Sequence, residues 1–379
     1  MCPARDPNNL LSNGSVCFLN YDLAYGGTEK VIASLANHFN DSGRKVTILT
    51  LSSRNDFKNF IHPEIQIISL NISRIKFLIP SLIRFISMQQ FDNFIANVWP
   101  LTVLTIGAGI FIRGFNKKVL LVEHCHLERE FSAFSSMFKF LQKISIMFLY
   151  RKSFKVIAVS EGVGSDLVDS KNVPAASVNV IQNPVAIEHN LNSTESTIIS
   201  QWVAFPGAKL ISVGTLKVQK NYPYLLRILA HLKSCNFHFK QLIVGEGPER
   251  KRLEELIVAL DLTEEVILAG TRDSPIEHIK KADLFILSSG FEGFGLVIVE
   301  ALAAGTTVVS TDCESGPAEI LKDGKLGYLA PIDDVEKFSE ILMHAYQNQM
   351  PSNLLIDRSQ DYSINLVGPK YIDLINQMK

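Results

Sequence analysis

Two carboxylates, Glu292 and Glu300, stand eight positions apart in a glycine-rich stretch that follows a predicted apolar strand. The first lies in the loop after that strand, and the second lies in the helix that the loop opens. Gly290, Gly293 and Gly295 let the backbone approach a ligand closely and point free N–H groups at it. A strand, a glycine loop and a helix N-terminus together make an anion site. Two carboxylates beside such a site indicate a ligand with phosphate and many hydroxyls, and a sugar nucleotide fits that description.

A structural role is the alternative for this pair, in which Glu292 caps the helix and Glu300 is a solvated helix residue. The flanking residues favour the ligand role, because they are apolar and predict that the helix around Glu300 is largely buried. A buried carboxylate without a partner costs several kcal/mol. Ligand hydroxyls would supply the donors that it needs. The apolar neighbours are Val297, Ile298, Val299, Ala301 and Leu302.

A lysine-bearing loop follows another predicted strand in the same half of the chain. Lys220 lies between that strand and the next helix, in the loop that Gly214 begins. An ammonium group in this place would neutralise a diphosphate, and Lys217 offers a second one. A solvated loop lysine is the alternative, but the position beside Gly214 favours the ligand role for Lys220.

Two glycine pairs follow strands and open helices. Gly245 and Gly247 allow phosphate or ribose to approach, although many such loops carry glycine. Their loop lacks the full Gly-x-Gly-x-x-Gly spacing and does not follow the first strand, and both facts argue against a dinucleotide redox site. Gly26 and Gly27 do follow the first strand. They either hold a phosphate or the acceptor at the next helix or form a tight turn, and the residues alone leave both roles open.

One histidine directly follows a predicted parallel strand. His124 comes after the strand 118–122, where an imidazole can bond a sugar hydroxyl in a cleft. His126 competes for this role, and a structural role for either histidine is a serious alternative. We prefer His124 because it comes first after the strand. Glu319, which follows a Gly-Pro turn, is expected to cap its own short helix.

The composition indicates a large protein with two domains. The chain has 379 residues, of which 47% are hydrophobic, so both domains can bury sizeable cores. The net charge of −1 gives no global attraction to nucleic acid. Residues 1–190 contain 19 Lys and Arg against 14 Asp and Glu, whereas residues 191–379 contain 18 against 24. The basic N-terminal half indicates a lipid surface or an anionic acceptor.

The cysteines and the apolar runs bear on other classes of site. The five cysteines are scattered, without Cys-x-x-Cys or a cluster with metal spacing, which predicts a reduced intracellular protein without structural zinc. The polar residues 1–13 lack the apolar core of a signal peptide. The longest apolar run, 101–112, is too short to span a bilayer, and we expect a buried helix there. We expect no metal and no cofactor.

Short apolar runs alternate with helical patterns along the first half of the chain. The first strand, 15–20, precedes an amphipathic helix over 28–40, and the alternation continues to residue 181. This pattern is typical of an α/β domain with a doubly wound parallel sheet. The further strands are predicted at 45–51, 66–70, 94–98, 118–122, 156–159 and 178–181.

A polar stretch at 188–205, rich in Asn, Ser and Thr, separates this series from a second one. We therefore predict two Rossmann-like doubly wound domains that face each other across a cleft. Their expected bounds are 1–187 for the first domain, 188–206 for a linker and 207–359 for the second domain, with a final helix in 360–379 packing back toward the first domain. The second series has strands at 210–213, 241–244, 266–269, 284–287 and 307–310, and helices at 222–235 and 248–260.

Two stretches of the N-terminal half combine basic and apolar residues. Residues 131–160 contain no acidic residue, and residues 72–91 carry Arg74, Lys76 and Arg84 among Phe, Leu and Ile. Basic amphipathic helices of this kind can lie on an anionic leaflet, and internal helices with a basic solvent face are the alternative. The positive charge of this half favours the membrane. The cations of the first stretch are Lys139, Lys143, Arg151, Lys152 and Lys155.

The motifs described above occur together and in order along the chain. Their combination resembles the family-four retaining glycosyltransferases of the GT-B fold, over nearly the whole chain and most specifically across residues 210–330. The resemblance implies a nucleotide-sugar donor bound mainly by the C-terminal domain, retention of anomeric configuration, and no metal. Residues 312–321 are similar to bacterial enzymes that build lipid-linked O-antigen, capsule or glycan precursors. That similarity favours a UDP-hexose or UDP-N-acetylhexosamine donor.

The resemblance also implies roles for single residues. Glu300 would bond the donor ribose, and Glu292 would bond hydroxyls of the transferred sugar. Lys220 would stabilise the departing diphosphate, and His124 would contact the donor sugar. Lys220, Glu292 and His124 are thus the expected catalytic residues, with Gly26 and Gly27 near phosphate or acceptor. The expected donor site comprises Gly214, Lys220, Gly245, Gly247, Glu292, Gly293, Phe294, Gly295, Leu296 and Glu300.

One departure from the family pattern concerns charge. Many members have Arg directly after the glycine that matches Gly214, whereas this chain has Thr215. Lys220 must then carry more of the diphosphate charge, with help from Lys217. Two rival interpretations follow: a GT-B sugar-nucleotide epimerase, which needs no acceptor, and a catalytically weak sugar-nucleotide-binding module.

The expected partners are a nucleotide-sugar donor, a glycan or lipid-linked acceptor, and an anionic membrane that the protein contacts peripherally. No nucleic acid is expected. The protein is expected in the cytoplasm, at the inner face of the membrane. The expected mechanism uses no protein nucleophile, because the protein positions the reactants and stabilises the leaving group.

Overall fold

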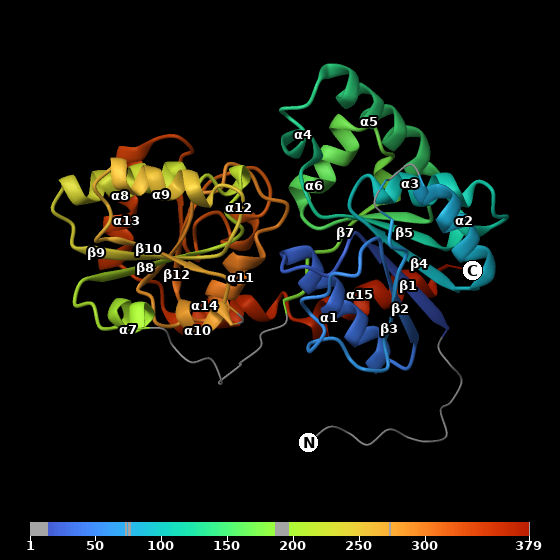
Figure 1. Cartoon of the computed structure of the whole chain (residues 1–379), viewed down its shortest axis with the longest axis horizontal. Helices are drawn as coiled ribbons and strands as arrows, with labels where there is room; N and C mark the ends of the chain where they lie inside the picture. The colour runs from blue at the N-terminus through green and yellow to red at the C-terminus, as the bar shows by residue number, and fades with distance from the viewer. Residues whose placement is uncertain (1–13, 73, 75–76, 186–196, 273, 379) are drawn as a thin grey trace.

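A computed structural model describes residues 14–72, 74, 77–185, 197–272 and 274–378. It contains two α/β units side by side, each with a central parallel sheet between layers of helices (Figure 1). Parallel strands require crossover connections, and the helical patterns between the strands supply them. The fold class predicted from the sequence, two doubly wound Rossmann-like units, is confirmed.

The N-terminal sheet has seven strands in the order β3-β2-β1-β4-β5-β6-β7. Its inner strands are buried on both faces, as expected where helices cover a parallel sheet. Every strand predicted in this half is present, with ends shifted by at most one residue. The strands are β1 (Ser15–Asn20), β2 (Lys45–Thr50), β3 (Gln66–Ser69), β4 (Asn93–Asn97), β5 (Val119–Glu123), β6 (Lys155–Ala158) and β7 (Val178–Val180).

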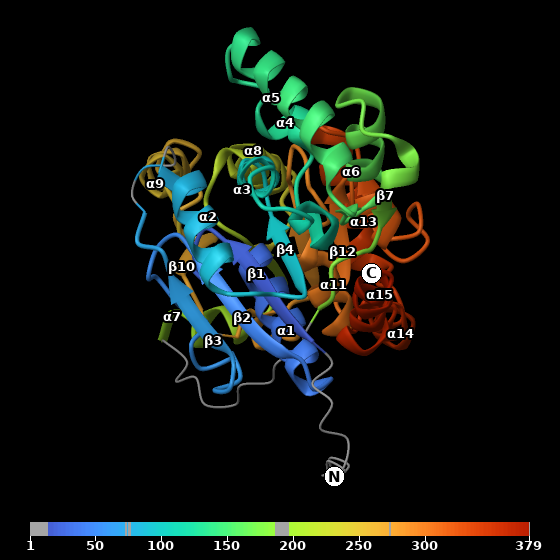
Figure 2. The same cartoon turned by 90° about the vertical axis from the view of Figure 1, so that its right-hand side faces the viewer.

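Helices α1 and α15 cover one face of this sheet, and α2, α3 and α5 cover the other (Figures 1 and 2). The predicted buried helix at 101–112 is confirmed as α3, although it ends at Gly109. Helix α15 comes from the far end of the chain, and Gly368 lets it approach His38 of α1. The helices are α1 (Gly27–Asp41), α2 (Leu78–Met88), α3 (Leu101–Gly109), α4 (Leu127–Glu130), α5 (Ser136–Leu149), α6 (Glu161–Ser165) and α15 (Ile364–Asn376).

The C-terminal sheet has six parallel strands in the order β10-β9-β8-β11-β12-β13. The edge strand β13 (Tyr328–Ala330) was not predicted, because Gly327 and Pro331 bound it and leave no longer apolar run. It pairs with β12 from Val309 to Thr311. The other strands are β8 (Ala208–Val213), β9 (Phe239–Val244), β10 (Val266–Gly270), β11 (Leu284–Leu287) and β12 (Thr307–Thr311).

Part of the stretch predicted as a linker is helical. Helix α7 (Thr197–Val203) is anchored by Trp202, which is fully buried and donates its indole N–H to the carbonyl of Lys240 at 3.1 Å. The sequence did not predict this helix, because the polar residues around it favour a linker. Residues 188–196 of that stretch lie outside the described residues. The remaining helices are α8 (Tyr222–Ser234), α9 (Arg250–Ala259), α10 (Pro275–Ile279), α11 (Leu296–Ala303), α12 (Pro317–Ile320), α13 (Val335–Gln347) and α14 (Ser352–Gln360).

The apolar core does not divide at the boundary between the two sheets. One cluster lies between the C-terminal sheet and helices α8, α9 and α13. The other face of that sheet, with α11 and α14, belongs to a cluster that continues through the N-terminal unit. Phe294 and Tyr362 join the two parts, with ring centroids 5.3 Å apart. The two units are therefore held together by apolar packing as well as by polar contacts.

Candidate active site

The loops that follow several strands of both sheets meet between the two units. The loop after β11 contacts the N-terminal unit at Gly293, whose carbonyl accepts a hydrogen bond of 2.6 Å from Ser160 Oγ after β6. A Cβ at Gly293 would overlap the carbonyl oxygen of His124 after β5. The carboxyl ends of parallel strands are where ligands bind in open α/β sheets. Most of the predicted site residues lie in these loops or directly beside them.

Lys220 and Glu292 form an ion pair in the C-terminal unit. The distance from Lys220 Nζ to Glu292 Oε1 is 2.7 Å, and the side chains are 13% and 6% exposed. Ser289 Oγ donates to the same oxygen at 2.6 Å. Both partners come from loops after neighbouring strands, Lys220 after β8 and Glu292 after β11. The pair satisfies a carboxylate that would otherwise be buried alone, and it holds a cation beside the glycine loop.

The glycines of the β8 and β9 loops pack against one another. A Cβ at Gly245 would overlap the carbonyl of Gly214, and one at Gly247 would overlap that of Leu216. This close approach explains glycine at both positions without a ligand. Gly214 itself lies against the Lys220 side chain, with Cε 3.1 Å from where its Cβ would stand. Contact of Gly214, Gly245 and Gly247 with a nucleotide stays a prediction.

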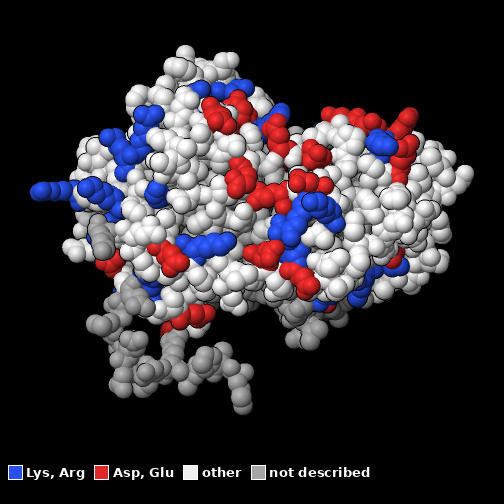
Figure 3. Space-filling view, turned by 180° about the vertical axis from the view of Figure 1, so that it is seen from behind, with Lys and Arg blue, Asp and Glu red and all other residues white. Residues whose placement is uncertain are grey.

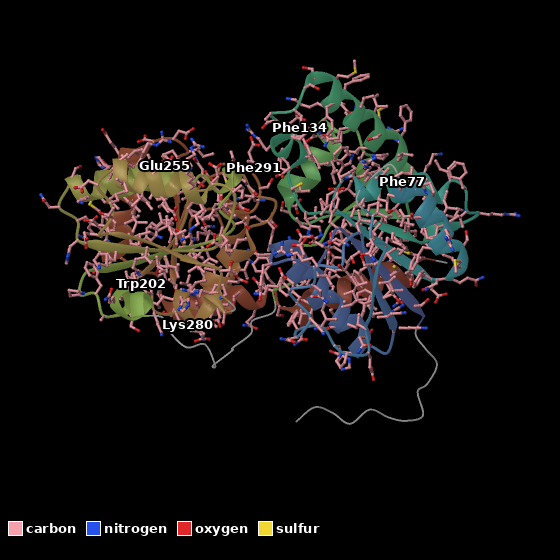
Figure 4. All side chains as sticks on the ribbon, viewed as in Figure 1. Phe77, Phe134, Trp202, Glu255, Lys280 and Phe291 are labelled. Atoms are coloured by element: carbon pink, nitrogen blue, oxygen red, sulfur yellow. The ribbon has the colours of Figure 1, made fainter. Side chains whose placement is uncertain are left out.

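The stretch Gly293–Leu296 leads into helix α11. Gly295 has a φ of +95°, a conformation that favours glycine, and it is the N-cap residue. The Phe294 side chain is buried against Tyr362, so only its backbone is placed to meet a ligand. The side chain of Phe291, just before Glu292, lies at the edge of the C-terminal unit that faces the N-terminal unit (Figure 4). The Ile298 N–H donates to the Gly295 carbonyl at 2.8 Å, so the N–H groups of Leu296 and Val297, the first two of α11, are the ones that can bind an anion.

Glu300 is paired across the two units. Its Oε1 accepts a hydrogen bond of 2.5 Å from Lys30 Nζ, and the side chains of Lys30 and Glu300 are 28% and 13% exposed. Lys30 lies in the first turn of α1, three positions after Gly27. Sequence reasoning missed Lys30, because a single lysine on an amphipathic helix carries no signal of a distant partner.

The Gly26-Gly27 turn faces the start of α11, at the end of the loop after β11. A Cβ at Gly27 would stand 3.1 Å from Leu296 Cδ1, which places the start of α1 against the start of α11. Glu29, in the same turn, accepts a hydrogen bond of 3.1 Å from Asn20 Nδ2. Burial raises the pKa of Glu29, and the positive charge of Lys217 from the other unit opposes this shift.

His124 is held in one tautomer by Asn97. The Asn97 amide Nδ2 donates to the Leu19 carbonyl at 3.0 Å, so its Oδ1 faces His124 Nε2 at 3.1 Å. The proton of the imidazole must then be on Nε2, and Nδ1 is left as an acceptor. Burial lowers the pKa of His124 to about 3, so the ring is neutral at physiological pH. A neutral ring with an acceptor nitrogen suits a hydroxyl partner.

His126 has a different environment from its neighbour. Its two ring nitrogens lie 3.7 Å from Asp166 Oδ2 and 3.6 Å from Glu314 Oε2. Glu314 belongs to the C-terminal unit and also pairs with Arg129 of α4. His126 is therefore one member of a charged cluster that joins the two units.

Glu319 corrects a prediction. The sequence predicted that it caps its own short helix, but the N-cap of α12 is Gly316 and makes no side-chain cap. Glu319 instead accepts hydrogen bonds from the N-terminal unit, at 3.0 Å from the Glu161 backbone N–H and at 2.9 Å from Gln182 Nε2. Capping rules are local and carry no information about a partner more than a hundred positions away.

Glu123 lies beneath the site, at the end of β5. It is fully buried, and its carboxylate accepts hydrogen bonds from Tyr150 and, at 3.0 Å, from Thr102. The Trp99 backbone N–H also points at it, at 3.3 Å. Burial raises the pKa of Glu123 to about 7, although these hydrogen bonds oppose the shift. Among the described residues, no group of three or more His, Cys, Asp and Glu side chains is arranged to hold a metal ion.

Family models match both units of the chain. The model for glycosyltransferase family 4 matches residues 25–189, and the model for glycosyl transferases group 1 matches residues 204–361. The chain belongs to the family-four glycosyltransferases. It is therefore a transferase enzyme, and the family resemblance drawn from the motifs is confirmed. The matches do not favour the rival epimerase or binding module.

Several curated relatives are named as glycosyltransferases, among them enzymes of amylovoran and lipopolysaccharide biosynthesis. An N-acetylgalactosaminyltransferase of Campylobacter jejuni, which acts on a diphospho-undecaprenol substrate, is 30% identical over 219 residues, 58% of each chain. The amylovoran biosynthesis glycosyltransferase AmsD of Erwinia amylovora is 25% identical over 93% of this chain and 96% of its own. The lipopolysaccharide 1,6-galactosyltransferase of Escherichia coli is 27% identical over 52% and 56% of the two chains.

Solved structures of other proteins share the fold. The Anabaena protein HepE in complex with UDP-glucose superposes with a TM-score of 0.77 and is 21% identical, covering 96% of this chain and 99% of HepE. A glycosyltransferase of Rickettsia africae superposes with a TM-score of 0.76 and is 18% identical, covering 96% and 98%. These likenesses establish the GT-B architecture of this glycosyltransferase.

Proposed function

We propose that this glycosyltransferase is a retaining enzyme that moves a sugar from a nucleotide donor to a glycan or lipid-linked glycan acceptor in cell-surface polysaccharide assembly. The observation that carries the proposal is the Lys220–Glu292 pair, held at 2.7 Å beside the glycine loop of α11. His124 approaches that loop from the other domain. A cation for the diphosphate and a carboxylate for sugar hydroxyls thus stand together at an anion-binding helix end.

The donor that fits this site is a UDP-hexose or UDP-N-acetylhexosamine. Its diphosphate would lie between Lys220 and the first N–H groups of α11. Thr215 offers no charge where many relatives have Arg, so Lys217 would supply the second cation from the same loop. Support for uridine comes from HepE, which shares the fold and has been solved with UDP and with UDP-glucose.

The proposed reaction needs no protein nucleophile and no metal. The bond between the anomeric carbon and the diphosphate oxygen breaks, and the acceptor oxygen bonds to that carbon on the same face. A diphosphate oxygen takes the proton of the acceptor hydroxyl. The enzyme contributes position and electrostatic stabilisation of the leaving group, which Lys220 and the α11 N–H groups would provide.

The acceptor is proposed to be lipid-linked, with the enzyme bound peripherally at the inner face of the membrane. One curated relative acts on an undecaprenol-linked substrate. Helix α5 projects from the N-terminal domain (Figure 2). In the described part of the chain, no helix has the length and apolar character to cross a bilayer. The apolar side chains that α5 exposes are Met137, Phe140, Leu141 and Phe148.

The division of labour between the two carboxylates tests the proposal. Glu300→Gln keeps the side chain's shape but removes the charge-assisted bonds to ribose, so UDP affinity is expected to weaken by about 1.5–3 kcal/mol. Glu292→Gln is expected to lower turnover while UDP still binds, because this residue would face the sugar. Calorimetry with UDP on both variants decides the matter, and equal loss of UDP affinity in the two would refute the division.

A donor screen tests the reaction class. The purified protein is expected to hydrolyse its preferred UDP-sugar slowly and to transfer that sugar once a lipid-linked acceptor is added. Conversion of the donor to an epimer without acceptor would contradict the proposed transfer.

A further inference from the structure

Lys30, in the N-terminal domain, reaches Glu300 of the other domain, a residue predicted to bind the nucleotide-sugar donor. Its Nζ donates to Glu300 Oε1 at 2.5 Å, and the two partners are 270 positions apart in the chain. The exposed fractions of 28% and 13% show that much of the pair is shielded from water. Such a pair holds its geometry better than an exposed one, in which water competes for both charges.

We propose that Lys30 is a positioning residue that orients Glu300 for the donor ribose. The inference rests on the proposed function, because only there does Glu300 bind a nucleotide. The chemical class of ligand that the pair selects is a ribonucleotide with its 2′-hydroxyl, which donates a hydrogen bond to the oriented carboxylate.

The two helices that carry the pair lie in matched register. Gly27 begins α1 and lies against Leu296, which begins α11. Lys30 is three positions further along α1, and Glu300 is four positions further along α11. Gly27 and Lys30 are about one turn apart and lie on the same face of α1, and Leu296 and Glu300 likewise lie on the same face of α11. The Gly27–Leu296 contact therefore sets the distance at which Lys30 can reach Glu300.

The carboxylate keeps acceptor capacity for a ligand. A carboxylate offers about four lone-pair directions on its two oxygens. Lys30 occupies one direction at Oε1. Among the described residues, no side chain donates a hydrogen bond to Oε2 of Glu300. Ribose hydroxyls can therefore donate to the remaining lone pairs while Lys30 stays in place, and the contact at Oε1 restricts the orientation of the carboxylate.

The consequence is a link between the two domains and the nucleotide. If Lys30 orients Glu300, the ribose is recognised well only when the N-terminal domain is in position. Recognition of the 2′-hydroxyl then depends on the ion pair. An ion pair that served only to join the domains would not influence this recognition.

The test compares the binding of UDP and 2′-deoxy-UDP by calorimetry. The wild type is expected to prefer UDP by roughly 10-fold or more, the value of one charge-assisted hydrogen bond. Lys30→Met is expected to reduce this preference to less than about 3-fold, close to that of Glu300→Gln. Lys30→Arg is expected to restore it, because a guanidinium also donates to a carboxylate. Lys58→Met, an exposed lysine of the same domain, is the control and is expected to keep the wild-type preference.

The outcomes separate this inference from the proposed function. An unchanged preference in Lys30→Met, in a variant whose circular dichroism matches the wild type, would overturn the positioning role. If Lys30→Met does not fold, the same measurement on Lys30→Gln decides. A wild type that binds neither nucleotide overturns the proposed donor and this inference with it. A wild-type preference that survives in Glu300→Gln shows that Glu300 does not bind ribose, and it also overturns the inference.

Discussion

Lys220 has two partners in the proposed mechanism, one in the resting protein and one during the reaction. In the structure it neutralises the buried Glu292, and in the reaction it would face the departing diphosphate. Thr215 carries no charge, so little in its own loop besides Lys217 can replace it. Lys220→Ala is therefore expected to lower turnover by roughly 100-fold or more, the scale of losing one preorganised charge stabiliser. Steady-state kinetics with the preferred UDP-sugar measures the effect.

The control for this variant is Lys251→Ala, which removes an exposed lysine of α9 in the same domain. It is expected to keep wild-type turnover. Thermal unfolding of both variants is recorded as well, because Glu292 loses its cation in Lys220→Ala. Near wild-type activity of a folded Lys220→Ala protein would remove Lys220 from the catalytic machinery.

Glu123 makes stability depend on pH, because burial raises its folded-state pKa from 4.5 to about 7. Between these values the folded protein holds a proton on Glu123 and the unfolded chain does not. Stability from this group is therefore present below about pH 4.5 and is lost as the pH rises to about 7, by up to about 3 kcal/mol. Glu123→Gln stays neutral and is expected to escape the loss.

Urea unfolding of the wild type and Glu123→Gln at pH 5 and pH 8 checks this expectation. The stability of the variant relative to the wild type is expected to rise between the two pH values. The comparison between proteins is needed because His124, whose pKa burial lowers, acts in the opposite direction below about pH 6.5. The same difference at both pH values would show that Glu123 does not titrate in this range.

At the scale of elements, helix α5 is unusual in exposing apolar side chains beside cations. Only Gln142 and Ile146 of this helix are buried. Phe134, just before it, lies at the upper side of the N-terminal domain (Figure 4) and is half-exposed. Seen from behind, Lys and Arg side chains lie at the outer edge of that domain, and both Lys and Arg and Asp and Glu lie in the middle of the molecule (Figure 3). The second basic stretch contains Lys76, which lies outside the described residues.

The protein is accordingly expected to sediment with anionic vesicles at low salt and less so at high salt. Each cation near an anionic leaflet contributes about 1 kcal/mol, and salt screens this attraction. Changing Lys139, Lys143, Arg151 and Lys152 together to Gln is expected to release the protein while UDP still binds.

A matched control changes four exposed cations of the C-terminal domain to Gln and is expected to leave vesicle binding intact. These residues are Lys251, Arg252, Lys322 and Lys325. If the wild type does not sediment with anionic vesicles at any salt concentration, α5 is an ordinary surface helix and the acceptor is soluble.

At the scale of the whole molecule, the two domains meet through backbone groups of the donor loop. Gly293 has no room for a side chain, because a Cβ would overlap the His124 carbonyl. Gly293→Ala must therefore push the two domains apart or shift the loop. A displacement of this size near the reacting groups is expected to lower kcat/KM by roughly 100-fold.

Gly290→Ala, in the same loop, is the matched control, because its Cβ would meet nothing nearer than the Gln219 carbonyl at 3.9 Å. It is expected to lose far less activity than Gly293→Ala. Activity assays and small-angle scattering of both variants measure the effect and the domain spacing. Equal activity of the two variants would show that the contact at Gly293 is not needed for catalysis.

Local pattern determined much of this protein. Short apolar runs predicted the strands of both sheets except β13, because strands that helices cover on both faces consist largely of apolar residues. The motifs around Lys220, Glu292 and Glu300 led to the family, since glycine and charge after a strand already imply a site. Two short elements were not predicted: β13 is a three-residue edge strand between Gly327 and Pro331, and α7 is a seven-residue helix in a polar stretch, in which Ile199 and Trp202 are buried.

The tertiary structure alone decided which residues meet across the two domains. Glu319 reaches Gln182, and Glu300 reaches Lys30, over 137 and 270 positions of sequence. No spacing rule connects such partners, because helix and strand periods describe neighbours along one element. Their contact depends on how the two sheets are packed, and a shared apolar core through Phe294 sets that packing. The sequence by itself determined which residue types each loop carries after its strand, and the packing of the domains decided which loops lie together.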